Sequence, residues 1–196
     1  NPGTEGGQAL SDVLYGEVNP SGHLPYTYPS RPTGYALYDH KASERLAADF
    51  GTGGAEPLFA FGHGASYTTF EYSGLAVSDT LLTTAALQDG GTVDVEVTVT
   101  NTGDRAGKDV VQLYLRDEVA TVTPSVRKLK RFAKVDLAPG ESQTLTFTLA
   151  RGDFSFIGRN AAPVVEPGRF GIQVDTLEAG LTLTGAPLNG GSEASP

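Results

Sequence analysis

The sequence contains no cysteine, no methionine and no tryptophan. Without cysteine the chain cannot form disulfide bonds, attack a substrate with a thiol or bind zinc through thiolates. The lack of cysteine is compatible with export, and we favour a secreted or periplasmic location over a cytoplasmic one. Because methionine is missing even at the first position and the chain starts Asn-Pro-Gly, we interpret it as a piece of a longer polypeptide or a processed product.

The chain also has few basic residues and no long apolar run. It has 14 lysine and arginine residues and 23 acidic residues, which gives a formal net charge of −9. An acidic protein repels the phosphate backbone, so we expect no nucleic-acid partner. No apolar run approaches the ~20 residues of a membrane-spanning helix, so we expect no membrane partner. A chain of 196 residues can bury roughly 70% of its unfolded surface, which is enough for a sizeable core.

The first third of the chain, residues 1–66, is rich in turns and aromatic residues and has the pattern of the closing stretch of an α/β unit. Thr4 is placed to cap a short helix that Gly16 ends, since glycine is favoured just beyond a helix C-terminus. Residues 24–28 predict a short extended edge segment interrupted by a proline. Residues 43–50 predict two further helical turns, followed by a glycine-rich loop.

After residue 72 the hydrophobic period changes to two, the pattern of half-buried antiparallel strands. The alternating apolar rows are Val93, Val95, Val97 and Val99; Val111, Leu113 and Leu115; Leu145, Phe147 and Leu149; and Phe170, Ile172 and Val174. Turn signals separate these rows, and helical windows are almost missing. We therefore predict a mainly β fold, with an immunoglobulin-like β-sandwich over residues 67–186. A flexible tail is predicted at residues 187–196.

The usual nucleophile and metal motifs are missing. Ser66 lacks the second glycine of a nucleophile elbow. The three histidines, His23, His40 and His63, are too scattered for a metal-binding helix motif. We therefore predict neither a metal nor a cofactor.

Paired carboxylates, as in glycosidases, are the remaining enzymatic chemistry. The loop-rich first part holds Glu5, Asp39, Glu44 and Glu56, and loops commonly carry functional sites. The competing interpretation is that these groups are solvated surface or helix caps. That interpretation is strong for Glu5, whose negative charge would meet the positive end of a helix dipole.

One segment, residues 126–135, holds five basic residues and no acidic one. It can be interpreted as a nucleic-acid site. We prefer a strand with a basic outer face, because four apolar side chains share its other side: Leu129, Ala133, Val135 and Leu137.

Several short motifs follow one another along the chain. Residues 3–10, 12–16 and 19–25 (the last reading Asn-Pro-Ser-Gly-His-Leu-Pro) resemble the late part of the second catalytic domain of glycoside hydrolase family 3. Residues 57–64 and 66–70 resemble its passage into a fibronectin type III-like domain. Residues 97–103, 111–115, 129–132 and 137–141 resemble that domain's strands and turns. The likeness runs over nearly the whole chain, from about residue 2 to residue 183.

The resemblance implies a retaining, exo-acting β-glycosidase such as a β-glucosidase or β-xylosidase. In that family an aspartate nucleophile lies on a barrel and a glutamate acid/base on the following α/β sandwich. The two carboxyl groups of a retaining enzyme lie about 5–5.5 Å apart, so both must be present in one pocket. Neither family motif is found in this sequence, so we predict no catalytic residue in it and an inactive isolated chain.

We therefore predict the C-terminal part of such an enzyme, most simply a β-glucosidase hydrolysing terminal β-linked sugars. Residues 1–66 would complete the α/β-sandwich domain, and the predicted partners are a β-linked oligosaccharide or glycoside and the missing N-terminal catalytic part. The candidate contacts at the rim of the substrate pocket are Glu5, Tyr38, Asp39 and His40, with ordinary loop packing as their alternative.

The competing function is a non-catalytic module that binds a carbohydrate or a protein, because immunoglobulin-like sandwiches host many functions. The lack of tryptophan argues against it, since sugar-binding surfaces usually stack sugar rings on exposed aromatic side chains.

Overall fold

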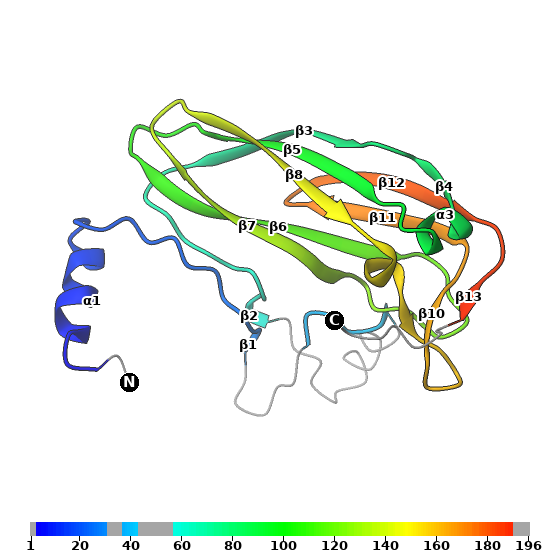
Figure 1. Cartoon of the computed structure of the whole chain (residues 1–196). Helices are drawn as coiled ribbons and strands as arrows, with labels where there is room; N and C mark the ends of the chain where they lie inside the picture. Colours follow the sequence, from blue (N-terminus) through cyan, green and yellow to red (C-terminus); the bar gives the residue numbers. More distant parts are fainter. Residues whose placement is uncertain (1–2, 31–36, 43–56, 190–196) are drawn as a thin grey trace.

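The computed structural model of the chain describes residues 3–30, 37–42 and 57–189 (Figure 1). The helical turns predicted at residues 43–50, the glycine-rich loop after them and the end of the predicted tail from residue 190 lie outside the described residues. None of the described helices is long and apolar enough to cross a membrane.

Two sheets pack face to face in a β-sandwich that makes up most of the molecule (Figure 1). The larger sheet has the order β4-β12-β11-β6-β7, formed by Leu81–Thr83, Leu177–Thr184, Gly168–Val174, Gly107–Asp117 and Lys128–Leu137. The smaller sheet has the order β3-β5-β8, formed by Phe70–Val77, Val93–Asn101 and Ser142–Leu149. Neighbouring strands are antiparallel except β4 and β12, which run parallel.

The alternating rows face the space between the two sheets, as predicted. Val93, Val95, Val97 and Val99 on β5 are fully buried, whereas Glu96 is exposed. The row of β8, with Phe147 and Leu149, lies beside it in the same sheet. The rows of β6 and β11 supply the opposite side of the core, with Val111, Leu113, Leu115, Phe170, Ile172 and Val174. Successive side chains of a strand point to opposite faces, so an in-phase apolar row buries itself as one unit.

Three short elements close the ends of the sandwich. Helix α3 (Thr84–Gln88) is capped by Thr83, the residue before it, whose side chain accepts a hydrogen bond from the amide of Ala86 at 3.1 Å. The 3-10 turn η2 (Arg151–Phe154) follows β8. A small third sheet has the order β13-β10-β9, from Leu188–Asn189, Pro163–Val165 and Phe156–Ile157.

The helix predicted near the N-terminus is α1, Gly6–Leu14. Gly16 follows it with φ +80 and donates to the carbonyl of Val13 at 3.1 Å, which confirms its role in ending the helix. The prediction that Thr4 caps the helix is wrong, because the cap position is Glu5 and no side chain caps it. Gly3, at φ +76, allows a tight turn in which the Gly6 amide bonds to the Gly3 carbonyl, and this moves the start of the helix one residue onward.

The extended segment predicted at residues 24–28 forms ladder pairs only at its end. Strand β1 (Tyr28–Pro29) pairs with β2 (Pro57–Phe59), while the amide of Leu24 separately donates to the carbonyl of His63 at 2.9 Å. Proline has no amide hydrogen to donate to a ladder, so Pro25 interrupts the pairing between these two places.

The basic segment of residues 126–135 contains β7, which carries a bulge. The β6–β7 register jumps from Leu113↔Arg131 to Tyr114↔Leu129, so Lys130 has no partner across the ladder. Lys128 and Lys134 are exposed as predicted, but Arg127, Lys130 and Arg131 are half-buried. The uniformly basic outer face is therefore wrong at these positions. Arg131 stands opposite the buried Leu113, on the same face as Val135, whereas the bulge changes the phase before it, so that Leu129 stands opposite Tyr114 and no longer shares that face.

Candidate functional site

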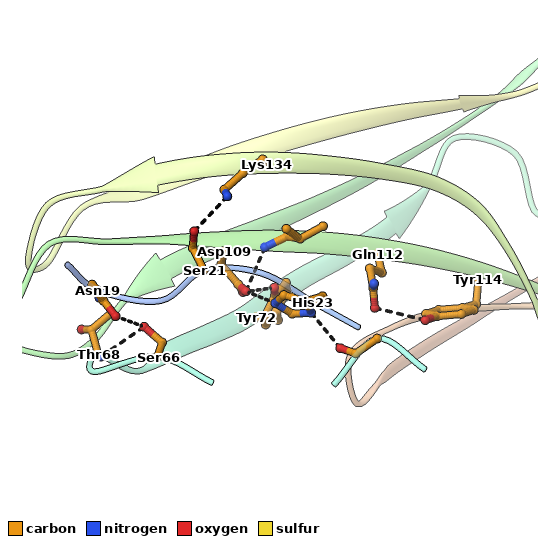
Figure 2. Close-up of polar contacts among 12 residues, drawn as sticks. Asn19, Ser21, His23, Ser66, Thr68, Tyr72, Asp109, Gln112, Tyr114 and Lys134 are labelled. Atoms are coloured by element: carbon orange, nitrogen blue, oxygen red, sulfur yellow. Dashed lines mark hydrogen bonds and ion pairs between the residues drawn. The ribbon is translucent and has the colours of Figure 1, made fainter. Parts of the chain in front are cut away.

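A network of polar contacts joins the N-terminal segment to the sandwich (Figure 2). We call these contacts the junction. On the N-terminal side they come from residues 19–23 and 62–68, and on the sandwich side from β3, β5, β6 and β7. The figure shows His23, Tyr72 and Asp109 converging at its centre.

His23 bonds to an acceptor with each of its two ring nitrogens. Nδ1 lies 2.7 Å from the carbonyl oxygen of Gly62, and Nε2 lies 2.9 Å from Oδ1 of Asp109. A carbonyl oxygen and an ionised carboxylate only accept hydrogen bonds, so both contacts are satisfied when both nitrogens carry a proton, that is, in the imidazolium form of the ring. The hydrogen bond to Asp109 raises the pKa of His23, while partial burial works against it.

Asp109 is buried and takes three donors. The Tyr72 hydroxyl donates to Oδ2, and the amide of Val110 donates to Oδ1 at 2.9 Å beside the His23 contact. Burial acts to raise the pKa of Asp109, but the hydrogen bonds from His23 and Tyr72 outweigh it and hold that pKa below its usual value. Burial raises the pKa of Tyr72, which therefore remains a donor.

The motif residues around the junction explain why the two segments can approach this closely. A Cβ atom on Gly64 would lie 2.8 Å from the His23 ring, and one on Gly62 would lie 2.4 Å from Oε1 of Gln112. Gly62 also has φ +80, a conformation that residues with a side chain rarely adopt. Glycine is therefore required at both positions for this contact.

Asn19 makes a second set of bonds across the junction. Its Oδ1 accepts from the amide of Tyr67 at 2.8 Å and from the Ser66 hydroxyl at 3.0 Å, and its Nδ2 donates to the carbonyl of Ala106 at 3.1 Å. Thr68 next in the chain donates to Oδ1 of the fully buried Asn101 at 2.7 Å. The segment that precedes β3 is thereby bonded to the end of the sandwich at several points.

The predicted rim residues occupy two separate places. Tyr38 stacks on Phe61 with ring centres 4.1 Å apart and meets Tyr114 of β6 edge-on at 6.5 Å. The carbonyl of His40 accepts from the amide of Val126 at 2.8 Å. Tyr38 and His40 therefore lie against the sandwich, with the half-buried Asp39 between them in the chain.

Glu5 is exposed at the start of α1, which stands away from the sandwich (Figure 1). Within the described ranges, no contact joins it to the other three candidates. Helix α1 itself presents apolar side chains to solvent, since Leu10, Leu14 and Tyr15 are 60%, 67% and 85% exposed.

Sequence reasoning overlooked the junction, although one signal for it exists. Asp109 stands in phase with Val111 and Leu113, so an acidic residue occupies the inward-facing row of β6. A buried carboxylate requires partners, and this position could have predicted a histidine or tyrosine beside it. The identity of those partners comes from other segments and is not visible in the local pattern.

The junction is suited to holding segments together and poorly suited to proton transfer. An imidazolium with both nitrogens bonded has no lone pair to accept a proton. Among the residues that the structure describes, no group of three or more histidine, cysteine or acidic side chains is placed to hold a metal ion.

Two family profiles match the chain. Residues 1–67 match the glycosyl hydrolase family 3 C-terminal domain, and residues 109–177 match the fibronectin type III-like domain. Among curated proteins, a lysosomal β-glucosidase of Dictyostelium discoideum is 44% identical over 188 residues, which are 93% of this chain and 22% of that protein. A periplasmic β-glucosidase of Salmonella typhimurium is 37% identical over 180 residues, 87% of this chain and 23% of that protein.

The similar solved structures are β-glucosidases as well. A β-glucosidase from Erythrobacter marinus superposes with a TM-score of 0.80 at 37% identity, covering 91% of this chain and 24% of that one. A β-glucosidase from Listeria innocua in complex with glucose gives 0.77 at 33% identity, covering 94% and 27%. The chain spans about a quarter of the length of these relatives. It therefore belongs to glycoside hydrolase family 3, of which it carries a C-terminal domain segment followed by the fibronectin type III-like domain.

Proposed function

We propose that this chain is the C-terminal part of a retaining, exo-acting β-glucosidase that removes terminal β-linked glucose. The observation that carries the proposal is the likeness to solved β-glucosidases over more than nine tenths of the chain, at TM-scores of 0.77 and 0.80. The catalytic carboxylates would come from the part of the enzyme that this chain does not include, and the β-linked substrate would bind to the whole enzyme.

The contacts within the chain support separate roles for its two parts. Residues 1–66 complete the α/β-sandwich domain, and residues 67–186 form the sandwich that supports it. The exposed Leu10, Leu14 and Tyr15 of α1 are the surface that the remainder of that domain covers, because an apolar helix face is stable only when it packs against another element.

The polar contacts of the junction hold the α/β domain against the sandwich. His23 belongs to the Asn-Pro-Ser-Gly-His-Leu-Pro stretch of that domain, whereas Asp109 and Tyr72 belong to the sandwich. The loop with Tyr38, Asp39 and His40 rests directly on the sandwich, and we propose it, with Glu5, as a contact at the rim of the substrate pocket. The periplasmic and lysosomal relatives support a secreted or periplasmic location over a cytoplasmic one.

A chimeric enzyme tests the proposal. The corresponding C-terminal part of the Dictyostelium discoideum relative, which is 44% identical, is replaced by this chain, and the hydrolysis of an aryl β-glucoside is measured. We expect the chimera to hydrolyse the glucoside, because the motifs that meet the rest of the α/β domain are present in order. The same relative truncated at the splice point is the control and should be inactive.

A chimera that is folded and monodisperse but inactive would contradict the proposal. A chimera that hydrolyses an aryl β-xyloside and not the glucoside would support the β-glycosidase function but contradict the proposed specificity for glucose.

A further inference from the structure

A cavity of about 220 Å³ lies at one end of the sandwich, away from the junction. Its walls come from the ends of β6 and β7, the loop of residues 122–125 and the turn from η2 into β9. The junction residues do not line it. This volume is below the roughly 300–1,000 Å³ of pockets for drug-sized ligands, so it would suit a molecule of about one ring.

The floor of the cavity is aromatic. Phe154 and Phe170 meet edge to face at 5.3 Å, and both are almost fully buried. Phe156 and Leu115 extend the same apolar surface, while Ser125 is among the hydroxyl groups that line the cavity. An apolar floor with a few polar groups around it is the usual composition of a small-molecule site.

The bulge in β7 brings positive charge to this cavity. Lys130 is the unpaired residue of the bulge, and both it and Lys128 line the cavity. The next residue, Arg131, turns to the same end of the sandwich and bonds to Asp153. Bulges are over-represented where a side chain must be re-aimed at a site.

The two lysines make no direct contact with the carboxylates that also line the cavity. Asp153 is occupied, since its two oxygens accept from Arg131 at 2.7 Å and 2.6 Å and Oδ2 also accepts from the Ala150 amide at 2.9 Å. In the part of the chain that the structure describes, neither Lys128 nor Lys130 has a hydrogen-bond or ion-pair partner. The half-buried ammonium group of Lys130 therefore has no carboxylate in direct contact with it.

The other carboxyl group that lines the cavity, Asp117, takes up a proton more readily than an ordinary aspartate. Burial raises its pKa to about 6, the amide of Val119 acts against this, and the nearby Glu166 and Glu118 add to it. Burial likewise lowers the pKa of Lys130, which Asp153 partly restores. An anion in the cavity would relieve the cost of a half-buried, unpaired ammonium group.

We propose that this cavity binds a small aromatic carboxylate, with the ring on the phenylalanine floor and the carboxylate group at Lys130 and Lys128. The aromatic floor selects a flat apolar body, and the ammonium groups select an anion. Lysine supplies point charges with rotatable donors, which fit a single carboxylate.

Three probes test the aromatic ring and the negative charge of the ligand separately. Benzoate, benzamide and acetate are titrated into the purified chain at pH 7, and binding is followed by two-dimensional ¹H–¹⁵N NMR. We expect benzoate to bind with a dissociation constant below ~10 mM, with shifts at residues 122–125 and in η2. Benzamide keeps the ring without the charge, and acetate keeps the charge without the ring, so each should bind at least about tenfold more weakly.

Two variants test the role of the lysine. Lys130→Gln should weaken benzoate binding about tenfold, because it removes a charged donor. Lys108→Gln removes an exposed lysine of β6 that pairs with Asp136 outside the cavity, and it should leave binding unchanged. The proposal is overturned if benzoate causes no shifts at the cavity, if benzamide binds as tightly as benzoate, or if the folded Lys130→Gln chain binds benzoate as well as the Lys108→Gln chain.

Discussion

His23 and Asp109 lie 86 residues apart in the sequence and form an ion pair with Nε2 and Oδ1 2.9 Å apart. The second ring nitrogen of His23 lies against the Gly62 carbonyl, so two acceptors flank the imidazole and favour its charged form. This pair joins a turn of the family 3 C-terminal domain segment to strand β6 of the sandwich.

The first prediction is that the junction is stable over a limited pH range. Folding raises the pKa of His23, so its contribution is complete below its unfolded value near 6.5 and is lost as the pH rises through the folded value above that. Folding lowers the pKa of Asp109, so its contribution is present above 3.8 and is lost as the pH falls through its lower folded value. NMR titration of the His23 ring should therefore give a midpoint above 6.5. A midpoint below 6.5 would contradict the ion pair.

The second prediction concerns the loss of the carboxylate. Asp109→Asn leaves a partly buried imidazolium without its counter-charge, and we expect a loss of about 1–3 kcal/mol of unfolding free energy at pH 6. Urea unfolding measures this loss. Asp136→Asn is the matched control, because its pair with Lys108 is exposed and should contribute under ~1 kcal/mol. Equal losses in the two variants would show that the buried pair contributes no more to the free energy of unfolding than the exposed pair does.

The third prediction concerns the core row of β5. Val97 is fully buried between the sheets, so Val97→Asp places an unpaired carboxylate there and should cost several kcal/mol, enough to unfold the sandwich or leave it marginal. Its neighbour Glu96 is exposed, and Glu96→Gln should change stability by less than ~0.5 kcal/mol. Urea midpoints compare the two variants, and similar midpoints would be incompatible with the burial of this row.

The fourth prediction concerns Asp117, whose pKa of about 6 in the folded chain is raised by burial. A raised carboxyl pKa means that the folded state prefers the protonated form, so stability falls as the pH rises from 3.8 through about 6. Asp117→Asn removes this penalty and should raise the urea midpoint at pH 7.5 while leaving it nearly unchanged at pH 4. A variant that is less stable at pH 7.5 would indicate that the charged carboxylate has a favourable partner.

The fifth prediction concerns the activity of the chain by itself. The purified 196-residue chain should not release the chromophore of an aryl β-glucoside above background, because no carboxylate pair with the family motifs is present. Glu5→Gln provides the internal check. Turnover by the chain that this substitution abolishes would mean that Glu5 is a catalytic residue.

The strands of the sandwich could be predicted from the sequence because their signal is local. A period of two requires only that neighbouring side chains point to opposite faces, so Val93 to Val99 indicated both the strand and its buried side. The glycine that ends α1 was visible for the same reason, as was the order of the family motifs. The helix start was predicted one residue too early, since the turn at Gly3 and not the capping preference of Thr4 determines it.

The functional contacts depend on tertiary structure. Asp109 was recognisable as an acid in an apolar row, but only folding brings His23 and Tyr72 to it. The bulge at Lys130 depends likewise on the register between β6 and β7, which no single strand encodes. Local periodicity thus determined which residues are buried, whereas the pairing of charges across distant segments was decided by the packing of the sheets and the close approach that Gly62 and Gly64 allow.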